Sequence, residues 1–241
     1  MPTFTRWGQA HLTAIALTLI VPLLLAVWMR YDRSGRVGRW SAAGFATILL
    51  GTIGVMFVWL DRGAAPRWQD MMPLHLCDLA LFACAAACLT RLRFAYEIAY
   101  FWGLAGTLQG LITPDLDAGF PAAQFWFFFL GHGGIVGSVL FLTAGFGMRP
   151  RWSSLVRAYV TILAFAVVVG GFNAAFDTNY AYLCAKPGVP SLLDWLGPWP
   201  WYIGSLALVA LANFTLLYTP WVIVDRLRAR TAPWPDAPRA I

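Results

Sequence analysis

Long apolar segments separated by short polar connections run along the whole chain. Seven such segments lie at roughly 11–29, 41–60, 73–91, 95–112, 123–146, 155–176 and 200–224. A helix of about 20 apolar residues, rising 1.5 Å per residue, crosses the ~30 Å hydrocarbon core of a bilayer. The pattern therefore predicts an all-α bundle of seven transmembrane helices. The fourth segment is the weakest of them, because Glu97 and Gln109 lie near its ends.

The composition supports a membrane protein. The 241 residues are 60% hydrophobic and 12% charged, whereas soluble domains carry about 25% charged residues. Only the connection at 177–199 is long, and a loop of this length can fold over the mouth of a bundle as a lid. We therefore expect a single multi-pass bundle domain, residues 1–241. The net charge of +6 is carried by arginines at helix ends. There it sets the orientation of the protein in the membrane and attracts anionic headgroups, and it does not indicate nucleic-acid binding.

The positions of the basic residues predict the orientation of the bundle. Thirteen of the seventeen fall on one side: Arg30, Arg33, Arg36, Arg39, Arg91, Arg93, Arg149, Arg151, Arg157, Arg226, Arg228, Arg230 and Arg239. The other side has Arg6, Arg62, Arg67 and Lys186. Because arginine and lysine concentrate in cytoplasmic loops, we expect the N-terminus outside and the C-terminus in the cytoplasm.

Polar residues then gather in the outer half of the membrane. The third segment opens with His75, Cys77 and Asp78, close together at the mouth of an apolar helix. Ionisable groups in such a place mark functional sites by default. The predicted topology brings further polar residues of other segments to the same half, namely Thr107, Gln109, Asp115, His132, Asn173, Asp177, Asn179 and Tyr180. The inner half offers little beyond Glu97, near the headgroups.

The four cysteines divide into candidates for chemistry and for packing. Cys77 is the best candidate nucleophile, since a thiol near a histidine can ionise and attack an acyl carbon. Two other interpretations stay open: a packing residue, or a disulfide with Cys184 on the same outer side. Cys84 and Cys88 lie deeper in the same segment and are expected to pack. No cysteine–histidine pattern has the spacing of a metal site, and no cofactor is expected.

Three histidines receive different predictions. His132 lies inside an apolar segment beside Gly131, Gly133 and Gly134, which leave room for a substrate chain or for close helix packing. Its imidazole suits proton transfer, or a structural hydrogen bond. His75 and Asp78 share a helix face and can orient one another, whereas Cys77 lies roughly 100° from Asp78, which disfavours a triad within this helix. His11, at the outer end of the first segment, is expected to be solvated.

The remaining polar residues have two interpretations. Asp115, Asn173, Asp177, Asn179 and Tyr180 can bind a lipid headgroup, or can cap helices and form turns, and for each alone capping is favoured. Gln109, inside the fourth segment, is a candidate donor to an oxyanion.

Several motifs resemble the YwaF-type bacterial integral membrane proteins. They are Pro73–Ala80, Phe101–Gln109, Leu111–Asp115, Phe129–His132 and Asn179–Pro187, in the same order. This family is in turn similar to a mammalian transmembrane family that uses a cysteine to move fatty acyl chains on glycerophospholipids, and more distantly to the androgen-induced type of membrane hydrolase. The resemblance implies Cys77 as the nucleophile, His132 as the base, and a location in the bacterial cytoplasmic membrane.

The predicted function is therefore a lipid-acyl enzyme, either an acyltransferase or an ester hydrolase, with a glycerophospholipid or fatty acyl substrate in an outer-leaflet cavity. The alternatives are a small-molecule transporter and a membrane assembly factor without catalysis. A transporter needs polar residues that continue to the inner side, whereas these residues are one-sided. A rhodopsin-like protein needs a lysine in the last helix, and the only lysine is Lys186, in a loop.

Overall fold

A computed structural model describes residues 2–60, 67–187 and 192–231. The fold is all-helical over these residues, apart from one isolated bridge between Thr3 and Ala118. Its elements are α1 (Gln9–Tyr31), α2 (Arg36–Leu60), η1 (Trp68–Asp70), α3 (Leu76–Thr90), α4 (Arg93–Ile98), η2 (Ala99–Gly103), α5 (Leu104–Ile112), α6 (Ala123–Ala144), α7 (Trp152–Phe176), η3 (Tyr180–Tyr182), η4 (Leu192–Leu196) and α8 (Trp201–Thr231).

The all-helical prediction is confirmed, and each predicted apolar segment falls on a helix. The fourth segment is a continuous helical run in which η2, a π-helical turn, joins α4 to α5. Among the described residues, four helices are long and apolar enough to cross a membrane, namely α1, α6, α7 and α8, and α3 is a shorter apolar helix. The chain is therefore a multi-pass membrane protein. The count of seven spans and the orientation of the ends stay predictions.

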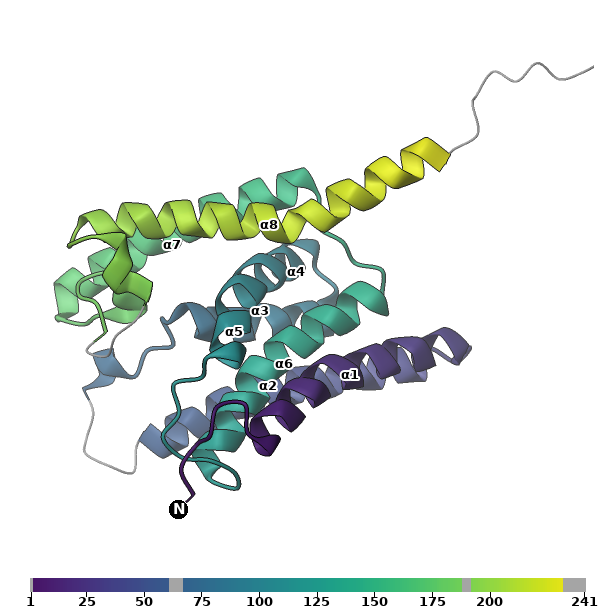
Figure 1. The fold of residues 1–241 in the computed structure, drawn as a ribbon, viewed down its shortest axis with the longest axis horizontal. Coiled ribbons are helices and arrows are strands. Elements are labelled where there is room, and N and C mark those ends of the chain that lie inside the picture. Colours follow the sequence, from purple (N-terminus) through teal and green to yellow (C-terminus); the bar gives the residue numbers. More distant parts are fainter. Residues whose placement is uncertain (1, 61–66, 188–191, 232–241) are drawn as a thin grey trace, which may run out of the picture.

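Three groups of helices make up the structure (Figure 1). The central group is α3 to α6, with α1 and α2 on one side and the antiparallel pair α7 and α8 on the other. Large apolar side chains of the outer helices face away from the bundle: Val167 of α7 is 77% exposed and Leu216 of α8 is 69% exposed. Such surfaces suit contact with lipid rather than with water.

Glycines of α6 allow its neighbours to approach closely. A Cβ atom added to Gly133 would lie 2.6 Å from Thr18 Oγ1 of α1, and one added to Gly137 would lie 3.2 Å from the Phe45 ring of α2. Small residues at helix contacts are the usual means of close packing in membranes. The approach of Thr18 supports the packing role of Gly133, but Gly133, Gly134 and Gly137 also line an apolar cavity of about 530 Å³, so room for a substrate chain stays the second interpretation.

The π-helical turn η2 anchors the centre of the bundle to the outer pair. The indole of Trp102 donates to the carbonyl of Ala158 on α7 at 3.1 Å. The hydroxyl of Tyr100 donates to the carbonyl of Leu217 on α8 at 2.9 Å and accepts from the indole of Trp221 at 2.9 Å. Because π turns rotate the residues after them, they often occur where a helix must present particular side chains.

Glu97 is buried in an ion-pair network, which the sequence does not reveal. Its side chain is 1% exposed and its carboxylate accepts from Arg157 at 2.5 and 2.8 Å. Arg93 and the hydroxyl of Ser154 donate to the same carboxylate at 3.1 and 2.6 Å. A charge can be buried in this way because its partners satisfy it on several sides. The network ties α4 to the first turns of α7.

The prediction that His11 is solvated is wrong. His11 is fully buried; its Nδ1 accepts the N–H of Trp7 at 3.0 Å, and its Nε2 lies 2.8 Å from the carbonyl of Leu111. A carbonyl only accepts, so Nε2 carries the proton. The first turn of α1 is thereby joined to the end of α5, a contact that the sequence of α1 alone does not reveal.

We expect the substitution Gly133→Ala to lower the free energy of unfolding by about 1–3 kcal/mol, because the new methyl group overlaps Thr18. Thermal unfolding in detergent measures this. The control is Gly171→Ala on α7, where nothing lies within 4 Å of the added atom. Adding Thr18→Ala to Gly133→Ala should restore part of the loss, and a Gly133→Ala protein as stable as the parent would contradict the packing.

We expect Arg157→Gln to destabilise the protein more than Glu97→Gln, by about 1–3 kcal/mol. The first substitution leaves a buried carboxylate short of partners, whereas the second leaves arginines whose side chains are 46% and 44% exposed and can be hydrated. The double variant should be more stable than Arg157→Gln alone. Chemical unfolding of the three variants gives the order, and the reverse order would contradict this account.

Candidate functional site

The start of α3 is fixed by a carboxylate that caps the helix. His75 is the N-cap residue, with an extended backbone conformation. Asp78, three residues later, accepts the backbone N–H of His75 at 3.1 Å and is 5% exposed. A carboxylate in the first turn satisfies a free N–H group and interacts favourably with the helix dipole. The predicted pairing of His75 with Asp78 is therefore made through the backbone of His75.

Cys77 lies in the first turn of α3, half-buried, next to this carboxylate. Its Sγ is 3.8 Å from Oδ1 of Asp78, so the thiol donates to the carboxylate. The two side chains meet although they leave the helix in directions roughly 100° apart. All four cysteines are free thiols, and Cys184 is exposed in the loop after α7. Cys84 and Cys88 are buried in the core, which confirms the prediction that they pack. Cys77 is thus the thiol that adjoins an ionisable group at the helix mouth.

The ring of His75 lies against the loop after α7. Its centroid is 5.1 Å from that of Tyr180, edge to face, and 6.3 Å from that of Tyr182. The hydroxyl of Tyr180 donates to the carbonyl of Gln69 at 2.7 Å. Burial raises the pKa of the Tyr180 phenol, so the group stays protonated and keeps donating. Tyr180 therefore joins η1, α3 and the loop.

Two asparagines hold the described part of this loop. Asn173, near the end of α7, is buried; its side chain donates to the carbonyl of Tyr180 at 3.0 Å and accepts from the N–H of Tyr180 and the hydroxyl of Thr178. The side chain of Asn179 accepts from the N–H groups of Cys184 and Ala185 at 3.0 Å each. Both side chains hold turns of the loop, which agrees with the turn-forming interpretation, and their carboxamides are occupied by the loop itself.

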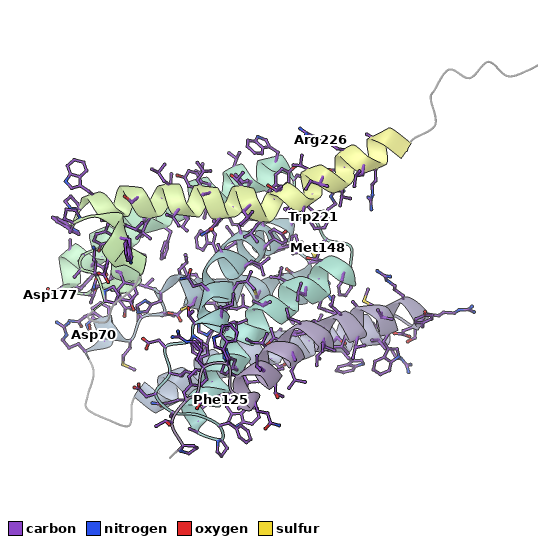
Figure 2. The ribbon with its side chains drawn as sticks, viewed as in Figure 1. Asp70, Phe125, Met148, Asp177, Trp221 and Arg226 are labelled. Atoms are coloured by element: carbon purple, nitrogen blue, oxygen red, sulfur yellow. The ribbon has the colours of Figure 1, made fainter. Side chains whose placement is uncertain are left out.

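The loop is also attached to the connection that precedes α3. Asp177 ends α7 in the left-handed conformation, and its carbonyl accepts from Arg67 at 3.2 Å. Arg67 also pairs with Asp70 at 2.7 Å, and Figure 2 shows Asp70 and Asp177 at the same end of the molecule. At the other end of the loop, the hydroxyl of Tyr202 on α8 donates to the carbonyl of Tyr182. The described part of the loop thus forms a cover against the start of α3.

His132 is oriented by its own helix. Its Nδ1 is 3.1 Å from the carbonyl of Phe128, and its ring stacks on the Phe128 ring at 4.2 Å. Because a carbonyl can only accept, Nδ1 carries the proton and Nε2 presents its lone pair. Gly110 of α5 lies beside this edge of the ring: a Cβ added there would be 3.2 Å from Cδ2 and 3.6 Å from Nε2.

Two clusters therefore carry the predicted site residues. His75, Cys77, Asp78, Asn173 and Tyr180 are linked by direct contacts, and Asn179 lies in the same cover. His132 lies on α6 against α5. Within the described residues, no hydrogen bond or ring contact joins Cys77 to His132. Gln109 and Asp115 are exposed.

The register between α3 and α6 shows how the clusters are related. The Cys84 thiol lies 3.9 Å from the carbonyl of Ile135, so Cys84 faces α6. Cys77 is two turns before Cys84 and shares its face, and His132 is three residues before Ile135. At 1.5 Å per residue, Cys77 is about 6 Å beyond His132 along the helix direction. This offset is longer than a hydrogen bond, so the thiol and the imidazole do not meet directly.

Within the described part of the chain, no group of three or more His, Cys, Asp or Glu side chains could hold a metal ion. The chemistry available at these clusters is that of a thiol, a carboxylate and a neutral imidazole with a free Nε2. Such groups can form and break an acyl bond by nucleophilic attack and proton transfer.

Most of the chain matches a known family of proteins. A family model described as the TMEM164 family matches residues 6–218, which include every helix from α1 to α7, most of α8 and all of the candidate site residues. No curated protein and no solved structure matches the chain.

We expect Asn173→Ala to loosen the cover over the start of α3. The substitution removes three hydrogen bonds that hold Thr178 and Tyr180, and should lower the local opening free energy by about 1–3 kcal/mol. Hydrogen exchange should then be faster in residues 178–183. Asn179→Ala is the matched control and should affect the amides of 184–185. Unchanged exchange at 178–183 in the Asn173 variant would contradict the role assigned to its carboxamide.

Proposed function

The chain belongs to the TMEM164 family, a family of transmembrane proteins, and we propose that it is a lipid-acyl enzyme of the membrane. Its substrate is a glycerophospholipid or another fatty acyl ester, and it acts as an acyltransferase or an ester hydrolase. Cys77 is the nucleophile and His132 is the general base. Within this proposal the protein is related to the YwaF-type bacterial proteins and to the cysteine-dependent phospholipid acyltransferases. Its location is the bacterial cytoplasmic membrane.

The observation that carries the proposal is the tautomer of His132. A histidine in an apolar helix can serve structure alone, and then both ring nitrogens have partners, as they do in His11. In His132 the backbone carbonyl of Phe128 fixes the proton on Nδ1. Its Nε2 has no hydrogen-bond partner among the described residues and is bordered by a glycine rather than by a larger side chain. This arrangement suits a base that accepts a proton from a reacting group.

The environment of Cys77 supports its role as nucleophile. The thiol lies in the first turn of a helix, where the dipole favours a developing negative charge, whereas the Asp78 carboxylate, 3.8 Å away, opposes that charge and can itself accept the thiol proton. It is a free thiol, half-buried, under a cover held by Asn173 and Tyr180. The cover limits access of water from one side, as an acyl-transfer enzyme requires when the intermediate is reactive with water.

The proposed reaction has two steps. The Cys77 thiol gives its proton to Nε2 of His132 through water or substrate atoms that fill the gap between the two residues, and the sulfur attacks the ester carbonyl carbon. The bond to the alcohol oxygen breaks, His132 returns the proton to that oxygen, and a lysolipid leaves. Water or a second hydroxyl then attacks the thioester with His132 again taking its proton, and the thiol is regenerated.

Other residues receive supporting roles in this proposal. The headgroup of the lipid lies against the cover and the start of α3, at a surface formed by His75, Asp78, Asn173, Asn179 and Tyr180. Asp115 extends this surface. A donor to the oxyanion is worth about 3 kcal/mol, and Gln109, next to the glycine that faces His132, is a candidate. With the predicted orientation, the site opens to the outer leaflet.

The proposal predicts a covalent intermediate on Cys77. Purified protein incubated with a phospholipid radiolabelled in its acyl chain should form an adduct that hydroxylamine releases. Cys77→Ala should abolish the adduct, and Cys184→Ala should retain it. His132→Asn should slow its formation by about 10²–10⁴-fold, and His75→Asn is the matched histidine control.

Three outcomes would overturn the assignment. Labelling that survives Cys77→Ala would remove Cys77 as the nucleophile. Adduct formation that is lost in His75→Asn but kept in His132→Asn would reverse the assignment of the base. Folded protein that forms no adduct with any of several phospholipids would favour the alternative of a transporter or an assembly factor.

A further inference from the structure

A polar cavity lies at the opposite end of the bundle from the start of α3. Its volume is about 570 Å³, and it is lined by Arg93, Tyr96, Gly147, Met148, Arg149, Arg151 and Asp225. These residues come from the first turn of α4, from the connection between α6 and α7, and from the last part of α8. In Figure 2, Met148 lies below α8, well away from Asp70 and Asp177. The cavity is therefore separate from the proposed acyl site.

The charge of the cavity is positive. Three arginines and one aspartate line it, which leaves a net charge of +2. The guanidinium of Arg149 pairs with Asp225 at 2.5 Å and lies 5.2 Å from the centre of the Trp221 ring. Both members of the Arg149–Asp225 pair are partly exposed, at 34% and 48%, and such a pair is weak enough for an incoming anion to replace the carboxylate.

The other two arginines retain capacity for a ligand. Arg93 uses its Nε for Glu97 at 3.1 Å, and its two terminal nitrogens have no hydrogen-bond partner among the described residues. Arg151 forms no ion pair within the described residues; its backbone N–H donates to the Ser154 hydroxyl at the start of α7. Guanidinium groups present paired N–H donors that match the oxygens of a phosphate. Three of them around one cavity form an anion site with more donors than one carboxylate can use.

The shape of the connection leaves space for such a group. Gly147 adopts a left-handed conformation, with φ of +66°, and nothing lies within 4 Å of a Cβ atom added to it. The hydroxyl of Tyr96, at the base, is already engaged with Met148 and Thr143 and fixes this turn. The cavity is larger than one phosphate ion, so it has room for a headgroup beyond the phosphate.

The surroundings indicate a lipid as the source of the phosphate. Trp152, one residue after Arg151, is 62% exposed and packs against Tyr218 of α8 at 6.1 Å. Tryptophan and tyrosine concentrate at the level of the headgroups. Beyond them the surface of α7 and α8 is apolar, with Val160 58% exposed and Leu216 69% exposed. A lipid with its phosphate in the cavity can lay its acyl chains along this surface.

We propose that this cavity binds the phosphate group of an anionic glycerophospholipid, held by Arg93, Arg149 and Arg151. Asp225 competes with the phosphate for Arg149, because the Asp225 carboxylate pairs with Arg149 when the lipid is absent. The bound lipid links α4, the start of α7 and the end of α8. This site is independent of the acyl chemistry, since none of its residues belongs to the Cys77 or His132 clusters.

Binding can be measured with the full chain purified in detergent. Native mass spectrometry during titration with phosphatidylglycerol or phosphatidylcholine should show retention of phosphatidylglycerol alone. The double variant Arg149→Gln/Arg151→Gln should bind phosphatidylglycerol about thirtyfold more weakly. The matched control Arg33→Gln/Arg36→Gln removes two exposed arginines, one between α1 and α2 and one at the start of α2, and should bind as the parent does. Asp225→Asn should bind about fivefold more tightly, an effect that damage to the fold would not produce.

The outcomes separate the sources of the anion. Equal loss of binding in both double variants would show that the lipid is attracted to basic loops in general and not bound in the cavity, and would overturn the proposal. Weaker binding in Asp225→Asn would also overturn it. A separate titration with inorganic phosphate, read by thermal unfolding, should give no shift at concentrations at which phosphatidylglycerol does. A phosphate shift lost in the Arg149 and Arg151 variant, with no effect of phosphatidylglycerol, would assign the cavity to a free anion and reject the lipid.

Discussion

The structure depends on the rule that a polar group away from water must be satisfied by the protein itself. Within the described residues, no buried side-chain nitrogen or oxygen lacks a hydrogen-bond partner. The rule explains why His11 reaches the carbonyl of Leu111, a hundred residues along the chain, and why Asn173 closes on Tyr180. Each of these contacts joins segments that apolar packing alone would leave free to slide, since lipid is as apolar as the helices.

The helices were predictable from the sequence because their signal is local. Apolar runs of membrane length fix where helices begin and end within a few residues, and the structure places a helix on each predicted segment. The π turn at Ala99–Gly103 was not predictable, because it preserves the apolar run and changes only the rotation of the residues after it. The burial of Glu97 was missed for a related reason: its main partner, Arg157, is sixty residues away, and only tertiary structure brings the two together.

The candidate site was predictable in its residue types more than in its geometry. The cluster of His75, Cys77 and Asp78 stands out in an apolar segment, and its position at the mouth of a helix follows from the sequence. The contact between the Cys77 thiol and Asp78 does not follow, because it depends on side-chain rotamers. Likewise the sequence marks His132 as unusual, but the hydrogen bond that fixes its proton is visible only once the helix and ring are placed.

The distance along the chain between Glu97 and Arg157 has a consequence for biosynthesis. The carboxylate leaves the ribosome sixty residues before its main partner, and until α7 is made, Arg93 alone can neutralise it. The helical run from α4 to α5 therefore carries an under-compensated charge until α7 is made. We expect insertion of this run to depend on α7, because a chain truncated before α7 leaves that charge exposed.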